Sequence, residues 1–266
     1  MIRPSAELFL GRLLRHLTCL FTFTCNLYTI WYLTLCEFAT IKVPTGSKVN
    51  VKENSKRGRP QTFNRDQVIE VALISYWRDG SSKVSLNEIC KRAGVSKPGI
   101  YRAFDGEDGL KQAVLLEYRA RILSQFHHIL QVEQPFNQTV TSLVAFLQMD
   151  RATLGLPAGC LHADMYEAKG EFGSLTVQTI ESIRQESLQQ LESWVERARG
   201  AGEISPAMPS SIVALYIYAQ LQSALRLQRD GVDQEHVLAC FRLALSVLDE
   251  DAPPEPDQTV TRHQGG

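Results

Sequence analysis

The sequence predicts an all-α protein with a small N-terminal helix-turn-helix domain and a larger C-terminal helical domain. Apolar residues between about 64 and 249 recur at the spacing of amphipathic helices, and no segment keeps the period-two alternation of a strand. Glycines and prolines fall between these segments, where helices end. A hydrophobic fraction of 44% and a charged fraction of 21% are typical of a soluble globular protein.

The first predicted helix begins after Asn64 as its N-cap and runs to Arg78, and Asp79-Gly80 ends it. We expect six of its residues to lie near the core of the small domain: Val68, Val71, Ala72, Ile74, Ser75 and Trp77.

A second, shorter helix is predicted from Ser85, which forms a capping box with Glu88 three residues later. Leu86, Ile89, Cys90 and Ala93 form its apolar stripe. Gly94 stands where the helix must end with a positive φ, a conformation that glycine adopts without strain.

The third helix follows after a tight turn. Ser96 is its expected N-cap, and Pro98 lies in its first turn, where a missing N–H does no harm. Two short helices joined in this way form a helix-turn-helix, whose second helix can enter the major groove of DNA.

These residues resemble the DNA-binding domain of the tetracycline-repressor (TetR) family. The resemblance rests on Ala-Gly-Val-Ser at 93–96, on Gly99, Tyr101, Phe104 and Leu110, and on Ser85 and Ile89 upstream, and it extends from about Arg57 to Val114. It implies a homodimeric regulator, most often a repressor, that binds double-stranded DNA at a palindromic operator and responds to a small-molecule effector.

The charge distribution agrees with this resemblance. Residues 56–104 carry ten basic and four acidic residues, a net charge of +6, whereas residues 105–266 carry 12 basic and 22 acidic residues, a net charge of −10. A basic module on an acidic body favours phosphate binding at one place on the molecule.

Candidate DNA-binding residues lie on the basic arm before the first helix and around the third helix. We expect Lys97 and Arg102 to reach base edges or phosphates and Tyr101 to bind a phosphate, while Gly99 lets the backbone approach DNA closely. The full set is Arg57, Arg59, Ser85, Ser96, Lys97, Pro98, Gly99, Tyr101 and Arg102.

Asp105 is the expected N-cap of a long fourth helix, whose apolar stripe runs through Leu110, Val114, Leu115, Tyr118, Ile122 and Phe126. At the position of Glu107, many family members have a lysine, which contacts the DNA backbone. A glutamate cannot bind a phosphate, so this sequence departs from the family there. Further helices are predicted at about 137–151, 159–169, 173–200, 209–230 and 233–249.

Two regulatory features are expected in the C-terminal domain. The resemblance implies an effector pocket among the middle helices, for which the candidates are Phe126, Phe146, Met149, Met165 and Tyr166, although each of them could equally be core. The last two helices are apolar on more than one face and are expected to pair with a second copy through Tyr216, Leu221, Leu225, Phe241, Leu245 and Leu248.

No catalytic residue, metal site or cofactor is predicted. Six cysteines show no C-x-x-C pair, which fits a reducing, cytoplasmic compartment. Cys160 and His162 are two residues apart and would face different sides of a helix. A cysteine-based redox sensor or a helical enzyme is the less favoured alternative.

The ends of the chain are expected to lie outside the fold. Residues 1–55 form an extension that is hydrophobic at 17–41, and 17–36 are long enough and free enough of charge to cross a bilayer. A membrane-tethered regulator and a packed or loosely ordered extension are alternatives, but we favour translation upstream of the true start, with Val43, Val49 or Val51 as start candidates. Residues 56–104 form the DNA-binding domain, 105–250 the regulatory and dimerisation domain, and 251–266 a disordered tail.

Overall fold

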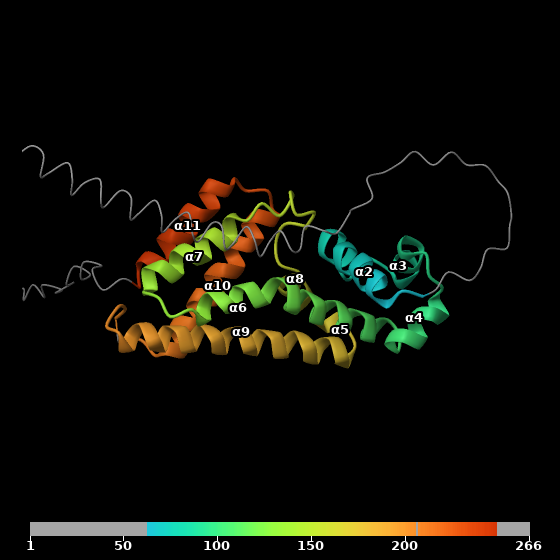
Figure 1. Ribbon diagram of the computed structural model, residues 1–266, viewed down its shortest axis with the longest axis horizontal. Helices are drawn as coiled ribbons and strands as arrows, with labels where there is room; N and C mark the ends of the chain where they lie inside the picture. The colour runs from blue at the N-terminus through green and yellow to red at the C-terminus, as the bar shows by residue number, and fades with distance from the viewer. Residues whose placement is uncertain (1–62, 206, 249–266) are drawn as a thin grey trace, which may run out of the picture. The chain divides into compact units, whose positions relative to one another are not determined.

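The computed structural model describes residues 63–205 and 207–248, and within these ranges the regular elements are helices without a strand (Figure 1). The all-α prediction is therefore confirmed. The predicted extension, Arg57, Arg59 and the C-terminal tail lie outside the described residues. Within the part described, no helix is both long and apolar enough to cross a membrane.

The first described helix, α2 (Arg65–Asp79), begins where the sequence predicts. The Asn64 side chain accepts a hydrogen bond from the Gln67 N–H at 3.1 Å, and Gly80 follows the helix with a φ of 93°. Most of the predicted set is buried, and Val71 is half-buried and packs against the core, whereas Ile74 is half-buried and lies outside this packing. Ile69, Leu73 and Tyr76 are also buried, since α2 packs against both α3 and α5.

The two short helices are α3 (Leu86–Ala93) and α4 (Lys97–Phe104). Ser85 Oγ accepts from the Glu88 N–H at 3.2 Å, Gly94 has a left-handed φ of 67°, and Ser96 Oγ accepts from the Gly99 N–H at 3.3 Å. The expected capping box is only half present, because the Glu88 carboxylate pairs with Arg92 rather than with the Ser85 N–H. The turn that joins the helices is as predicted.

The junction after α4 differs from the prediction. Asp105 does not cap the following helix; it ends α4 in the left-handed region at φ 59°, and its N–H donates to the Tyr101 carbonyl. The next helix, α5 (Glu107–Tyr118), has Gly106 as N-cap, with no side-chain hydrogen bond. A Cβ at Gly109 would lie 1.7 Å from the Phe104 carbonyl oxygen, so only glycine fits where α5 crosses the end of α4.

The expected long fourth helix contains a change of helix type. A π-helical turn, η1 (Arg119–Leu123), separates α5 from α6 (Ser124–Gln131). All six residues of the predicted stripe are buried, from Leu110 to Phe126. The stripe is therefore confirmed, although the helix type changes within it.

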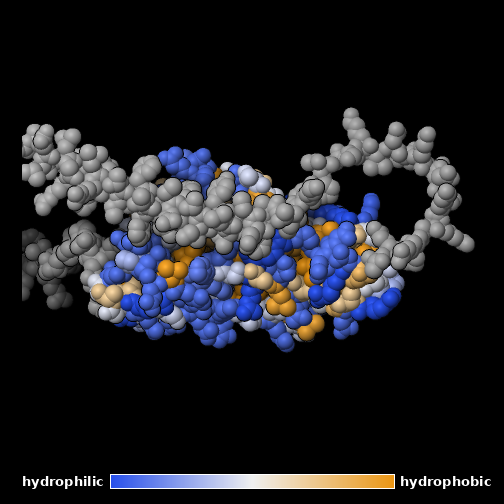
Figure 2. Space-filling view, in the orientation of Figure 1, coloured by the Kyte–Doolittle hydropathy of each residue, from blue (hydrophilic) through white to orange (hydrophobic). Residues whose placement is uncertain are grey.

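The remaining helices close the core around this segment. They are α7 (Phe136–Gln148), α8 (Leu161–Glu167) followed by the 3-10 turn η2 (Lys169–Glu171), α9 (Ser174–Gly200), α10 (Ser210–Arg229) and α11 (Gln234–Ser246), close to the predicted ranges. Helix α9 lies alongside α5 and α6 (Figure 1), and α10 packs on α9 and α11. On the visible face, hydrophilic residues predominate and apolar ones form separate patches (Figure 2).

Candidate nucleic-acid interface and regulatory cavity

Helix α4 is anchored by a small apolar base and leaves its polar side open. Only Ile100 and Phe104 are buried, whereas Tyr101 is 53% exposed. Lys97, Pro98 and Arg102 are exposed beside it. The helix therefore offers two cations and a phenol on an accessible surface, which is what contact with a phosphate backbone and base edges requires.

The serines that precede α3 and α4 are exposed at the same time as they cap their helices. Each Oγ accepts a backbone N–H, so its own O–H stays free to donate to a phosphate oxygen. The structure thus leaves Ser85 and Ser96 able to fill the expected role.

Gly99 has a reason for being glycine that the sequence did not reveal. A Cβ there would lie 3.1 Å from a ring carbon of Phe63 and 3.3 Å from Ser96 Oγ. Phe63 comes before α2 and is tilted against Phe104, with ring centroids 6.3 Å apart. The glycine therefore lets the segment before α2 pack against the start of α4.

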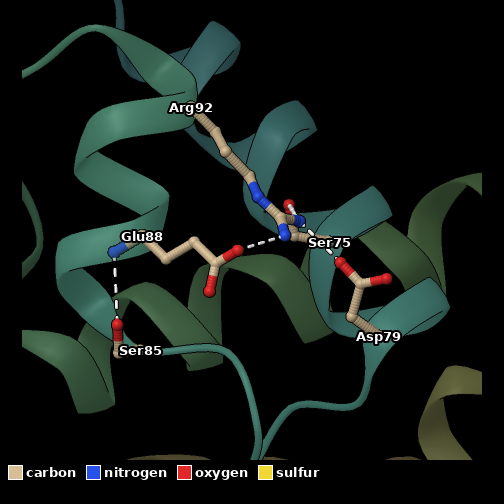
Figure 3. Close-up of polar contacts among 5 residues, drawn as sticks. All are labelled: Ser75, Asp79, Ser85, Glu88 and Arg92. Atoms are coloured by element: carbon tan, nitrogen blue, oxygen red, sulfur yellow. Dashed lines mark hydrogen bonds and ion pairs between the residues drawn. The ribbon is translucent and has the colours of Figure 1, made fainter.

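Arg92 fixes the relative position of α2 and α3 (Figure 3). Its guanidinium donates to Ser75 Oγ at 2.9 Å, to Asp79 Oδ2 at 2.6 Å and to Glu88. The hydrogen bond with Asp79 raises the pKa of Arg92. This arginine is one of the ten basic residues of the module, yet its contacts make it a structural link.

Glu107 also has an internal partner. Its carboxylate lies 2.8 Å from Lys111 Nζ, and Lys111 is buried, with Nζ 4.8 Å from the centre of the Phe172 ring. The glutamate thus compensates a buried cation on its own helix.

A narrow cavity of about 40 Å³ lies within the helical body. Of the five residues predicted for an effector pocket, Phe126 and Phe146 line this cavity. Met149, Met165 and Tyr166 do not, because Met165 is fully buried core and the other two pack at the side of the core. The sequence missed most of the lining, which includes Tyr118, Arg151, His162, Ser187, Tyr218 and Gln222. No local signal marks these residues, since they come together from α5, the segment before α8, and α8 to α10.

Cys160 and His162 each have a separate partner. The Tyr118 O–H donates to Cys160 Sγ at 3.4 Å, and the same sulfur accepts from the Ala163 N–H. His162 Nε2 lies 2.8 Å from the Ile180 carbonyl, to which it donates, and burial lowers the pKa of His162. Among the described residues no group of three or more His, Cys, Asp or Glu could hold a metal ion. This arrangement does not favour a redox or enzymatic site.

The predicted interface between copies needs correction. Leu221, Leu225, Phe241 and Leu245 are buried inside the protomer, and Tyr216 and Leu248 are partly buried. The large exposed apolar residues here are Ile212 and Leu215 on α10, Leu243 on α11, and Val247 directly after α11. Helices α10 and α11 are apolar on more than one side, as predicted, but the residues predicted for the interface face the core of the protomer and other apolar residues are exposed.

An exposed cationic recognition helix on a capped helix-turn-helix, carried by a helical body with an internal cavity, defines a sequence-specific DNA-binding transcriptional regulator. A model of the bacterial regulatory proteins of the tetR family matches residues 68–114, which extend from α2 into α5. This part of the chain is therefore the DNA-binding domain of a TetR-family transcriptional regulator.

Relatives agree with this assignment. The chain is 22% identical over 183 residues to the HTH-type transcriptional repressor ComR of Escherichia coli strain K12, covering 68% of this chain and 87% of that protein. It is 27% identical over 113 residues to the HTH-type transcriptional repressor BdcR of the same strain, covering 42% and 57%.

Solved structures show the same fold. A TetR-family regulator from Agrobacterium tumefaciens superposes with a TM-score of 0.62 at 16% identity, covering 70% of this chain and 97% of that one. A cysteine mutant of the regulator CifR, complexed with a 26-bp double-strand operator DNA, superposes with a TM-score of 0.58 at 20% identity, covering 71% and 98%.

Proposed function

We propose that this protein is a cytoplasmic, non-enzymatic repressor that binds a palindromic operator as a homodimer and leaves it when a small effector binds. The exposed polar side of α4 is the observation that carries the DNA-binding part. The names of the repressors ComR and BdcR support repression. The operator complex of CifR supports docking on duplex DNA.

The proposed DNA contacts come from the arm, from the two capping serines and from α4. Lys97 and Arg102 read base edges or phosphates, and Tyr101 binds a phosphate. We assign residues 56–104 to the DNA-binding domain and 105–250 to the regulatory domain.

The dimer is proposed to form through the exposed apolar side of α10 and α11. Leu243 is 72% exposed and Val247 is 63% exposed, one helical turn apart. The Tyr216 O–H donates to the Ala244 carbonyl at 2.7 Å, which places α10 beside this surface. Two α-helices from each copy would then bury the four exposed side chains.

Release from the operator is proposed to act through η1. This turn lines the cavity and contacts both the DNA-binding domain (the head, residues 56–104) and the rest of the regulatory domain (the body, residues 105–250). Ile122 and Leu123 line the cavity, Arg121 pairs with Glu70 on α2, and Arg119 Nε lies 2.8 Å from Glu186 on α9. An effector that displaces η1 would shift α2 and change the spacing of the two heads, which must match half-sites about 34 Å apart.

Selection of bound sequences from random duplexes, followed by footprinting, tests this function. We expect an inverted repeat whose half-sites are centred about one helical turn apart or a multiple of it. Leu243→Asp should give a monomer on a sizing column and lose the full site, whereas Ser246→Asp, exposed on the same helix, should leave the dimer intact. Binding without a repeat, or an unchanged dimer in Leu243→Asp, contradicts the corresponding part of the proposal.

A further inference from the structure

The cavity contains a buried cation without a counter-ion. Arg151 is only 8% exposed, and no carboxylate of the described residues forms an ion pair with it. Its Nη1 donates to the Gly159 carbonyl at 2.8 Å, while its Nε finds no hydrogen-bond partner. A guanidinium cannot lose its proton, so the charge stays in the interior. Burying an unpaired charge costs free energy that an anion would recover.

The rest of the cavity surface is suited to a compact apolar body. Among the described residues that line it, none is acidic, and His162 is neutral because burial lowers its pKa. Phe126, Phe146 and Leu225 supply apolar surface. Burial raises the pKa of Tyr118 and Tyr218, so both phenols keep their protons. Buried hydrogen-bonding capacity also remains at Gln222, whose Oε1 has no partner.

We propose that the cavity binds a small monocarboxylate, whose carboxylate pairs with the Arg151 guanidinium and whose apolar body lies among the aromatic rings. This inference rests on the proposed effector-controlled function and names the chemical class of the effector. A volume of about 40 Å³ suits a short acid, and a larger acid must push the walls apart. A planar guanidinium matches a carboxylate with two parallel hydrogen bonds, which a neutral amide cannot offer.

The same arginine touches the DNA-binding head. Its Cζ lies 5.8 Å from the centre of the Trp77 ring on α2, and 5.7 Å from that of Phe146. Tyr118, also in the lining, meets Trp77 edge to face at 5.0 Å. A carboxylate that draws Arg151 toward the cavity therefore weakens its contact with α2, which links binding to the position of the head.

Calorimetry on the full-length protein without DNA tests the ligand class. The probes are butyrate and benzoate, each compared with its amide, butyramide or benzamide. We expect each acid to bind at least tenfold more tightly than its amide. Equal affinities within a pair, or no binding by any of the four probes, would overturn the proposal.

Variants locate the effect at Arg151. Arg151→Met should reduce the affinity for the acid to that of the amide, and Arg151→Lys should retain part of the difference. Arg226→Met is the matched control, because Arg226 is exposed and pairs with Glu167 outside the cavity. If Arg151→Met binds the acid as tightly as the wild type does, the proposal is wrong. The ratio of acid to amide affinity in the wild-type protein needs no variant, so the test still holds if the mutant folds poorly.

A second readout separates this inference from the proposed function. The ligand-free protein is titrated with the selected operator, and then butyrate or butyramide is added to the complex. Acid-specific release supports both proposals. If the protein binds both operator and acid but the acid does not release the operator, acid-controlled release is excluded and the carboxylate site stands. If the ligand-free protein binds no operator, the proposed DNA-binding function alone is excluded.

Discussion

At the starts of α3 and α4, backbone N–H groups donate to side chains three residues away. Around the cavity, by contrast, polar side chains such as Tyr118 find hydrogen-bond partners in segments far apart in the chain. Ser85 and Ser96 cap their own helices, and Arg92 links neighbouring helices of the head. In the cavity, the Tyr118 O–H donates a hydrogen bond to Cys160 Sγ, while Arg151 Nε and Gln222 Oε1 have no hydrogen-bond partner. The starts of α3 and α4 are thus fixed by local contacts, whereas the cavity retains unused bonding capacity that a ligand could fill. On α2, Tyr76 Oη and Trp77 Nε1 are also buried without a hydrogen-bond partner.

The largest effect is expected at the junction that joins the two regions. Gly109→Ala places a Cβ 1.7 Å from the Phe104 carbonyl oxygen, and backbone must move to relieve the clash. We expect a loss of about 3 kcal/mol or more in the free energy of unfolding, measured by urea titration. Gly170→Ala is the control, because no atom lies within 4 Å of its Cβ position. Equal stabilities of the two variants would mean that the junction is not rigid.

Tyr101→Ala tests whether the rigid head is the part that binds DNA. We expect operator affinity to fall by about 1–3 kcal/mol in a gel-shift titration, with the dimer unchanged. Tyr101→Phe separates the hydroxyl from the ring, which packs over Gly106. If the alanine variant binds like the wild type, the docking surface is not the exposed side of α4.

The link between the two regions can be weakened without touching either site. Arg121→Met removes the ion pair between η1 and Glu70 on α2. The pair is partly exposed, so its effect on stability should be small. We expect effector-driven release to change by about 0.5–2 kcal/mol in coupling free energy, while operator affinity in the absence of effector stays within twofold. An unchanged coupling would exclude this route.

The smallest effect concerns protons in the body. Burial lowers the pKa of His162 and of His127, so the unfolded chain takes up these protons at a higher pH than the folded one. Stability should therefore fall as pH drops below about 6.5, by at most about 1.4 kcal/mol per pH unit for each proton. Urea titrations at pH 7.5, 6.5 and 5.5 measure this slope. A slope that His162→Gln leaves unaltered would remove this histidine from the explanation.

Sequence reasoning succeeded where the determining contacts are local. Caps at Asn64, Ser85, Gly94 and Ser96 act within four residues, so their residue types and spacing suffice. It failed at Asp105, because the sharp turn there is imposed by the approach of Gly109 to Phe104. On α10 and α11 it assigned core residues to the interface, because periodicity shows two apolar sides without telling which one meets the protomer.

The lining of the cavity was harder to predict from the sequence than the helix caps. It joins residues 118 to 225, and only two of the five predicted residues belong to it. Aromatic content pointed to the middle helices, but Arg151, predicted as the last residue of a helix, lies in the irregular segment after α7. A buried cation of this kind is recognisable only once its surroundings are known.

One contact has a practical meaning for chimaeric regulators. The Asp108 carboxylate, in the first turn of α5, accepts from the N–H groups of Leu175 and Thr176 at 3.0 and 3.1 Å and so caps the start of α9. A Cβ at Gly173 would lie 2.3 Å from this carboxylate. If a foreign DNA-binding domain were fused at a point after Asp108, the chimaera would lose the carboxylate that caps α9. The fusion point should therefore lie before Gly106, so that the regulatory domain keeps its own Asp108.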